Sequence, residues 1–549
     1  MDSQRLILFF VFSFSVFLLL DAWQRDQRSE PAPTPQTTQK GEQPALPRPS
    51  EKLVASQAAK PPEGSAVLAP GQTIKVETDF LRAEISTQGG DLRRLELKRH
   101  RDTLEKSKNF ELFQDQPDQV YVAQSGLLGN ALPNHRTVFA ARAGGYRLAE
   151  GAKIVELRLD APEVNGIKVA KVYRFHRASY VVDVGYEIFN HSAAAIQPFA
   201  YFQLLRDSKP PAGDSAMLPT YTGAAVYTDK EKFQKVAFAD IDKGKAPYPK
   251  NSNDGWIAIL QHYFFSAWLP KNGTPREFYM RRLDGGLYAA GVIVPAGSIE
   301  PGKSTMLAVP LYAGPQEQDK LDKLAPGLDL TVDYGWLTII AVPLFWVLAW
   351  INQWVGNWGI AIILLTVIIK LLFYPLSEAS YRSMARMRVL APRLQKIKEQ
   401  YGDDRQRMQQ AMMEIYKTEK INPLGGCLPI VVQIPVFIAL YWVLLASVEL
   451  RHAPFMLWID DLASPDPWFI LPIVMGATMI IQTKLNPEPP DPVQAKVMKI
   501  MPIAFSVFFF FFPAGLVLYW LVNNVLSIAQ QWHINRVLER ANLKPSSKA

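Results

Sequence analysis

Apolar residues divide the chain into two parts with different periodicity. Between residues 73 and 325 they occur in short alternating runs, one of which contains Val182, Val184, Tyr186 and Ile188. Alternation of this kind puts the apolar side chains on one face of a β-strand. Many such runs, separated by glycine-rich turn signals, predict a large β-sandwich over residues 73–325.

The remainder of the chain contains long apolar runs without charge. No Asp, Glu, Lys, Arg or His occurs between Asp333 and Lys370, an interval long enough for nearly two membrane spans. Tryptophans recur every four residues at Trp346, Trp350, Trp354 and Trp358. Because tryptophan prefers the membrane–water interface, we expect residues 326–356 to form an interfacial amphipathic helix and residues 357–376 to form a true span.

The charges of the loops test this choice. Residues 379–421 carry ten Lys and Arg against five Asp and Glu, so we expect this segment in the cytoplasm. Its apolar positions recur every three or four residues, which predicts a helical hairpin. Apolar runs at residues 424–447 and 468–483 then cross the membrane. If residues 336–351 crossed as well, every later segment would invert and the basic hairpin would face outward.

The last apolar stretch, residues 497–532, would be about 54 Å long as one helix, far more than a bilayer requires. Pro513-Ala514-Gly515 interrupts it, so we expect two short helices. Residues 357–541 would then form a five-span core that includes the hairpin, and residues 542–549 a cytoplasmic tail. Several spans have only about sixteen residues and should thin the bilayer around them.

The N-terminal residues 1–22 contain an apolar run after Arg5. The run is either a signal peptide or an uncleaved anchor, and the poor cleavage site at Leu20-Asp21-Ala22 favours the anchor. Residues 23–72 are rich in Pro, Gln, Ala, Ser and Thr, which predicts a disordered linker. The predicted fold is therefore an α-helical polytopic membrane protein with six spans, both termini in the cytoplasm and a large β-sandwich outside it.

Composition and charge exclude several classes of function. The net charge is +8, and much of the excess lies in short loops beside apolar spans, which indicates membrane orientation and not nucleic-acid specificity. The single cysteine, Cys427, excludes a disulfide framework and a cysteine-based metal cluster. The histidines have no metal-ligand spacing, and no nucleophile–base pair is evident. We therefore predict no cofactor, no metal and no enzymatic activity.

One motif suggests nucleotide binding. Residues 297–304 are GSIEPGKS, which matches the phosphate-loop pattern G-x-x-x-x-G-K-[ST]. Such a loop binds phosphate only between a strand and a helix whose N-terminus faces the ligand. Residues 306–312 are instead typical of a strand, interrupted at Pro310. We therefore expect a hairpin loop and not an ATP site.

Several short motifs resemble the YidC-type membrane protein insertases. They are LTVDYGW at residues 330–336, YPL at 374–376 leading into SMARM at 383–387, NPLGGC at 422–427 and FPAGLVL at 512–518. The resemblance covers the whole chain. It implies a protein of the bacterial inner membrane with a periplasmic β-supersandwich of the galactose-mutarotase type. It also implies insertion, folding and assembly of membrane proteins through a hydrophilic intramembrane groove, alone or with the Sec translocon.

The candidate site is this groove. Lys370 is the only charged side chain between Asp333 and Glu378, and Thr366 lies one turn earlier on the same helix face. The family usually has arginine in this span, so lysine keeps the charge but loses the planar fork. Polar surface could come from Gln433 and Asn523, and the family positions that line the substrate path match Ile434, Phe437, Tyr519 and Trp520. Snorkelling of Lys370 to the interface, and ordinary helix packing of the others, are the alternatives.

The resemblance implies several partners. These are nascent membrane proteins, the Sec translocon, the lipid bilayer, and the ribosome or targeting factors acting through the hairpin and tail. Two other functions stay open. A secondary transporter or channel would also use proline-broken helices, and a liposome flux assay would reveal it. An envelope sugar-binding module would make the external domain the active part, and deletion of that domain would reveal it.

Overall fold

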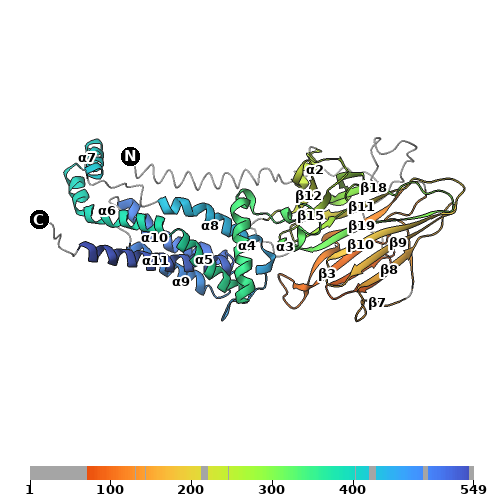
Figure 1. Cartoon of the computed structure of the whole chain (residues 1–549), viewed down its shortest axis with the longest axis horizontal. Coiled ribbons are helices and arrows are strands. Elements are labelled where there is room, and N and C mark those ends of the chain that lie inside the picture. The colour runs from red at the N-terminus through yellow and green to blue at the C-terminus, as the bar shows by residue number, and fades with distance from the viewer. Residues whose placement is uncertain are drawn as a thin grey trace. The chain divides into compact units, whose positions relative to one another are not determined.

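The computed structural model describes residues 71–129, 131–142, 144–211, 220–244, 246–401, 404–418, 428–485 and 492–542. The predicted anchor at residues 1–22, nearly all of the linker at 23–72 and nearly all of the tail at 542–549 lie outside the described residues. The described chain divides after Val332 into two compact units. The first is built from strands, and the second from helices (Figure 1).

Two sheets form the first unit. The ten-stranded sheet has the order β14 (Asn251–Ser252), β17 (Arg276–Leu283), β18 (Leu287–Pro295), β11 (Phe199–Asp207), β5 (Gln119–Leu128), β4 (Asn109–Gln116), β3 (Leu92–Arg101), β2 (Leu81–Ser86), β1 (Thr73–Glu77) and β7 (Tyr146–Arg147). The nine-stranded sheet has the order β13 (Lys232–Val236), β12 (Gly223–Thr228), β15 (Trp256–Leu260), β16 (Phe264–Trp268), β19 (Ser304–Pro315), β10 (Val181–Asn190), β9 (Ile167–His176), β8 (Ile154–Asp160) and β6 (Ala140–Ala141).

The alternating run of the sequence is the core face of β10. Its four apolar side chains have 0% exposure. Because β10 pairs with β9 on one edge and β19 on the other, it lies well inside its sheet (Figure 1). The two sheets pack face to face, since the Tyr186 hydroxyl of β10 hydrogen-bonds Ser125 Oγ of β5 at 2.9 Å. The predicted sheet-rich domain is therefore confirmed.

The segment that matches a phosphate loop connects two strands. It begins after β18 and ends at the start of β19, so no helix N-terminus follows it. The prediction of a hairpin was wrong, because β18 and β19 belong to different sheets and the loop crosses between them. The predicted strand break at Pro310 was also wrong, because β19 continues through it. Pro310 lies opposite Leu269, just beyond the end of β16, and its missing N–H therefore removes no ladder bond within β16.

The second unit contains eight described helices. They are α4 (Thr338–Val355), α5 (Trp358–Leu372), α6 (Tyr374–Gln400), α7 (Arg405–Thr418), α8 (Leu428–Ala446), α9 (Ile470–Leu485), α10 (Pro492–Phe508) and α11 (Ala514–Asn542). Among the described helices, α4 alone is long and apolar enough by itself to cross a membrane. A second candidate combines α5 with residues Tyr374–Met384 across a 65° bend. The apolar segments Val432–Ala446 and Ile470–Leu485 are shorter.

Helix α4 carries three of the four tryptophans. Trp346, Trp350 and Trp354 are 65%, 49% and 77% exposed, while the opposite face of α4 is buried. Trp358 does not continue this stripe, because Gly356 ends α4 in the left-handed conformation and the Asn357 side chain caps α5 by accepting a hydrogen bond from the Ile360 N–H at 3.0 Å. The stripe fits an interfacial position, but α4 could also cross by length, so the interfacial helix stays a prediction.

The predicted span at residues 357–376 ends early. Helix α5 stops at Leu372, and α6 begins at Tyr374 in a new direction. Pro375 explains the break, because proline has no N–H to continue the hydrogen bonding of α5 but fits the first turn of α6. A helix of 15 residues is about 22 Å long, less than the roughly 30 Å hydrocarbon core.

Helices α6 and α7 fall where the hairpin at residues 379–421 was predicted. Helix α6 runs to Gln400, and α7 begins at Arg405. The carboxylate of Asp404 caps α7 by accepting hydrogen bonds from the N–H groups of Gln406 and Arg407, both at 3.1 Å. The structure has two helices in this segment, but the hairpin itself stays a prediction. Their cytoplasmic location stays a prediction.

The predicted break at Pro513 is confirmed. Helix α10 ends at Phe508, and α11 begins at Ala514. The loop at residues 447–469, between α8 and α9, binds the start of α11. The Ser464 carbonyl accepts a hydrogen bond from the Ala514 N–H at 2.8 Å, and the Leu462 carbonyl accepts one from the Gly515 N–H at 2.9 Å. We call these two carbonyls the α11 socket.

Two carboxylates fix the loop that carries the socket. Asp461 accepts hydrogen bonds from the His452 and Ala463 N–H groups and from Ser464 Oγ, at 2.9–3.0 Å. Burial raises the pKa of Asp461, but the hydrogen bonds from His452 and Ser464 outweigh it and bring the pKa below its ordinary value. Asp466 accepts hydrogen bonds from Trp458 Nε1 and from the backbone at the start of α9.

Candidate functional site

A buried lysine is the centre of the candidate site. Lys370 lies near the end of α5 and is only 6% exposed. Its ammonium donates a hydrogen bond of 2.8 Å to Ser527 Oγ of α11. Thr366 is 1% exposed, and its hydroxyl donates within α5 to the Ile362 carbonyl at 2.7 Å. Lys370 and Thr366 therefore share an interior face, as their four-residue spacing predicts.

The rest of α5 explains why Lys370 points inward. The opposite face carries exposed apolar residues at Ile360, Leu364, Ile368 and Leu371. An amphipathic helix turns its apolar face to lipid and keeps a charge on the side of the other helices. The hydrogen bond to a second helix favours this inward orientation over snorkelling to the interface.

An aromatic cluster joins α8 to α11. The ring of Phe437 stacks on Tyr519, with centroids 5.8 Å apart and planes at 21°, and lies 4.5 Å from the ring of Trp520. Tyr519 is only 5% exposed. The indole N–H of Trp520 is buried and has no hydrogen-bond partner among the described residues. One turn earlier on α8, Gln433 is half-buried and Ile434 is 46% exposed.

Helix α11 brings the two groups together. The aromatic residues Tyr519 and Trp520 lie toward its start, and Ser527 lies two turns later, about 12 Å along the axis from Tyr519. Asn523 lies between them and is half-buried, and its carbonyl accepts the Ser527 hydroxyl at 2.7 Å. The arrangement therefore has a polar end at Lys370 and an aromatic end at Phe437.

One buried polar face of α11 was not predicted from the sequence. Asn524, Ser527 and Gln531 recur at three and four residues and are 4%, 4% and 3% exposed. Asn524 donates to Thr478 Oγ1 at 3.4 Å and Gln531 to the Leu485 carbonyl at 3.2 Å, so this face also packs on α9. The helical spacing of three polar residues in an apolar helix was a usable signal. The prediction named the neighbouring Asn523 instead.

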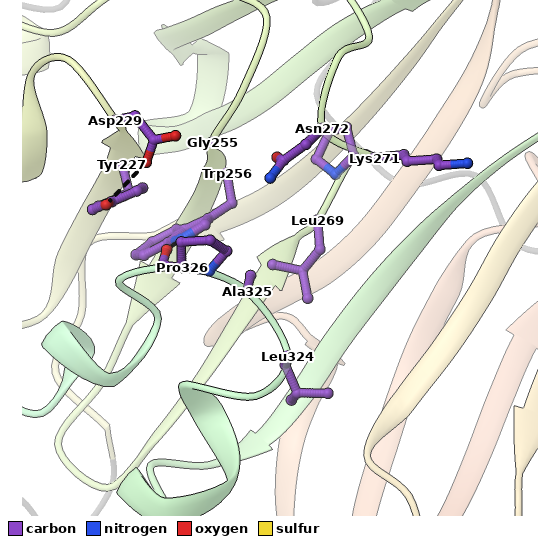
Figure 2. A pocket seen from close by; sticks show the side chains of 11 residues that line it. Tyr227, Asp229, Gly255, Trp256, Leu269, Lys271, Asn272, Leu324, Ala325 and Pro326 are labelled. Atoms are coloured by element: carbon purple, nitrogen blue, oxygen red, sulfur yellow. Dashed lines mark hydrogen bonds between the residues drawn. The ribbon is translucent and has the colours of Figure 1, made fainter.

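The first unit, built from strands, has a small pocket of about 190 Å³ (Figure 2). Figure 2 shows Tyr227 and Asp229 to one side of Trp256, and Lys271 and Asn272 to the other. The indole N–H of Trp256 donates to the Pro326 carbonyl at 3.0 Å and so fixes one wall. The lining mixes apolar, acidic and basic groups. Within the described ranges, no cluster of three His, Cys, Asp or Glu side chains could hold a metal ion.

The loop beside this pocket is held by one buried arginine. Arg276 is 1% exposed, and its guanidinium donates to five backbone carbonyls. The acceptors are Thr274, Gly255, Pro270, Asn253 and Lys271, at distances of 2.5–3.2 Å. Arg276 is therefore a structural centre of the domain.

Two family descriptions cover the chain. Residues 73–347 match the YidC periplasmic domain, and residues 350–541 match the family described as 60Kd inner membrane protein. A protein of Nitrosospira multiformis named membrane protein insertase YidC is 56% identical over 569 residues, covering 100% of both chains. The protein of the same name from Methylobacillus flagellatus is 58% identical over 553 residues, again covering 100% of both.

Solved structures were compared as well. A crystal structure described as an active YidC insertase with the first transmembrane domain resolved is 18% identical and has a TM-score of 0.39. The match covers 85% of this chain and 95% of the other.

Proposed function

The chain belongs to the YidC family of membrane protein insertases, and from this premise we propose that it moves substrate tails through a hydrophilic groove centred on Lys370. The family membership makes it an inner-membrane protein with a periplasmic domain, which inserts membrane proteins into the bilayer. The groove, its residues and its partners are the finer proposal.

The observation that carries the proposal is the buried Lys370 ammonium. A lysine within the hydrocarbon region is costly, on the order of 3 kcal/mol at the centre of a span and less toward its end. An ammonium has three N–H groups, and Ser527 Oγ is the acceptor for one of them. The other two can bind water or the polar groups of a passing chain. A charge that is retained among the membrane helices at this cost is well suited to attract the hydrophilic tail of a substrate.

The aromatic end of the site supports an apolar contact. Phe437, Tyr519 and Trp520 form one cluster, and Ile434 is exposed beside it. A substrate's apolar segment could slide along this side while its tail follows the polar side. Transfer of that segment from water to lipid supplies the driving force, so no nucleotide, metal or catalytic group is required. Short helices such as α5 shorten the dehydrated path further.

We also propose the finer organisation. The core at residues 357–541 has five spans, the anchor adds a sixth, and both termini lie in the cytoplasm. Helix α4, within the predicted segment 326–356, lies in the outer interface, and residues 73–325 form the periplasmic domain. The basic hairpin α6–α7 and the tail face the ribosome or targeting factors, and the protein works alone or with the Sec translocon.

Crosslinking to a stalled nascent chain tests the path. A photoreactive residue at Ile434 should crosslink to the apolar segment of a stalled single-span substrate. The matched control is Ile473 of α9, another exposed isoleucine at 56% against 46% for Ile434. We expect a strong product at residue 434 and little at residue 473, because only the first lies beside the aromatic cluster. Equal crosslinking at both positions would mean that the substrate meets the outer surface without preference.

Thiol labelling tests the topology. In a Cys427→Ser background, a cysteine at Gln400 should be shielded from a reagent that does not cross the inner membrane, because the charge balance puts the hairpin in the cytoplasm. A cysteine at the exposed Asp460, in the loop between α8 and α9, should be labelled in intact cells. Lysed cells provide the control in which both positions react. Labelling of residue 400 in intact cells would reverse the proposed orientation.

A further inference from the structure

Ser527 is a junction of three helices. Its hydroxyl oxygen accepts the Lys370 ammonium of α5 at 2.8 Å. It donates its own proton to the Asn523 carbonyl one turn earlier on α11, at 2.7 Å. The side chain of Tyr381 of α6 also interacts with Ser527. Ser527 and Lys370 are 4% and 6% exposed, so the junction is protected from bulk solvent.

The number of donors and acceptors on serine determines the role of the Ser527 hydroxyl. A serine has one O–H donor and two acceptor lone pairs. Because the Ser527 proton goes to the Asn523 carbonyl, a lone pair of the hydroxyl faces the Lys370 ammonium. Ser527 can therefore only accept from Lys370. Such a bond between a neutral hydroxyl and a charged donor is stronger than one between two neutral groups.

Because of the position of Lys370, its hydrogen bond to Ser527 decides which way the ammonium points. Lysine has a flexible four-carbon stem and can extend its ammonium toward the membrane surface. The end of α5 at Leu372 is only two residues away, so the interface is within reach. An acceptor on α11 holds the ammonium toward the other helices instead. A guanidinium carries five donors and would depend less on any one acceptor.

We propose that Ser527, assisted by Tyr381, is a positioning residue that turns the Lys370 ammonium toward the substrate path and away from the interface. The inference rests on the proposed role of Lys370 in the groove. It adds that this chain, with lysine in the first core span, depends on a serine of the last helix. The substrate group that meets the ammonium is an anionic or carbonyl-rich stretch of the translocated tail.

The experiment measures insertion by the purified full-length protein in reconstituted vesicles. The readout is the protease-protected fraction of single-span substrates with acidic, neutral or basic tails. Ser527→Ala should lower insertion of the acidic tail about tenfold, the scale of a hydrogen bond to a charged group, and leave the basic tail within twofold. Ser527→Thr keeps the hydroxyl and should restore the acidic tail. Tyr381→Phe should shift the same ratio in the same direction by less.

A matched control removes another interhelical hydroxyl. Ser506 of α10 donates to the Pro472 carbonyl of α9 at 2.8 Å, away from Lys370. Ser506→Ala should leave the ratio of acidic to basic insertion unchanged. A second comparison uses Lys370→Arg as the background, in which Ser527→Ala should cost less than about threefold because other donors of the fork remain.

The outcomes separate the two proposals. If Lys370→Ala does not change the acidic-to-basic ratio, the electrostatic groove itself fails. If Lys370→Ala changes the ratio but Ser527→Ala and Tyr381→Phe do not, only the positioning role fails. Equal loss for all three tails, or equal cost of Ser527→Ala in the lysine and arginine backgrounds, would reduce Ser527 to a packing residue. If Ser527→Ala does not fold, Tyr381→Phe decides, since it keeps the bulk of the native side chain.

Discussion

Lys370→Glu should reduce insertion of substrates with acidic tails by roughly a hundredfold, the largest loss expected for a single change in the membrane unit. The change replaces attraction by repulsion at a buried position, where two unit charges several ångströms apart interact by a few kcal/mol. It also removes the donor to Ser527 and places a carboxylate in its position. Lys370→Ala removes only the attraction and should have a smaller effect. Lys370→Arg keeps the charge and should be close to wild type.

The measurement compares tails of different charge. The protease-protected fraction in reconstituted vesicles should fall most for acidic tails, less for neutral tails and least for basic tails. Protein amount and vesicle orientation are matched by quantifying each variant in the same preparation. Equal insertion of all three tails by the Ala and Glu variants would reject an electrostatic role. Lys370 would then be better explained as a lysine that snorkels to the interface.

Arg276→Ala should destabilise the external domain by roughly 4 kcal/mol, because it leaves several buried carbonyls without their donor. For a domain of this size the melting temperature should fall by about 10 °C. A fragment of residues 73–332, which covers the first compact unit, can be followed by circular dichroism during heating. Arg276→Lys should recover only part of the loss, because a single ammonium cannot reach carbonyls on all sides.

The control for this change is a surface arginine. Arg282 is 53% exposed and pairs with Asp242 at 3.4 Å. Arg282→Ala should change stability by less than about 1 kcal/mol, as exposed ion pairs generally do. If Arg276→Ala and Arg282→Ala had similar melting temperatures, water would be replacing the lost donors, and Arg276 would not be the centre of the loop.

Local patterns predicted the local structure well. Alternation in Val182–Ile188 gave the buried face of β10, and four-residue spacing put Thr366 and Lys370 on one face of α5. Pro513 marked the break before α11, because proline lacks the N–H that would continue the hydrogen bonding of a preceding helix. These features depend on a few neighbouring residues, and the sequence displays them directly.

Features that depend on distant partners were missed. The hairpin predicted after β18 failed because consecutive strands can enter different sheets, and no local signal distinguishes the two cases. Pro310 was tolerated because β16 ends beside it, which is a property of another strand. The partner of Lys370 is 157 residues away in sequence, so Ser527 could be found only from the helix packing.

The α11 socket has a consequence for biogenesis. The first N–H groups of a helix lack partners within it, and two of those near the start of α11 are bound by carbonyls of the loop at residues 447–469. That loop leaves the ribosome about fifty residues before α11, and Asp461 and Asp466 hold it without help from the last helix. The two carbonyls of the α11 socket are therefore already in place when the last helix emerges from the ribosome. Damage to either carboxylate should delay maturation of the newly made chain, with the final helix entering late and exposed to quality-control proteases.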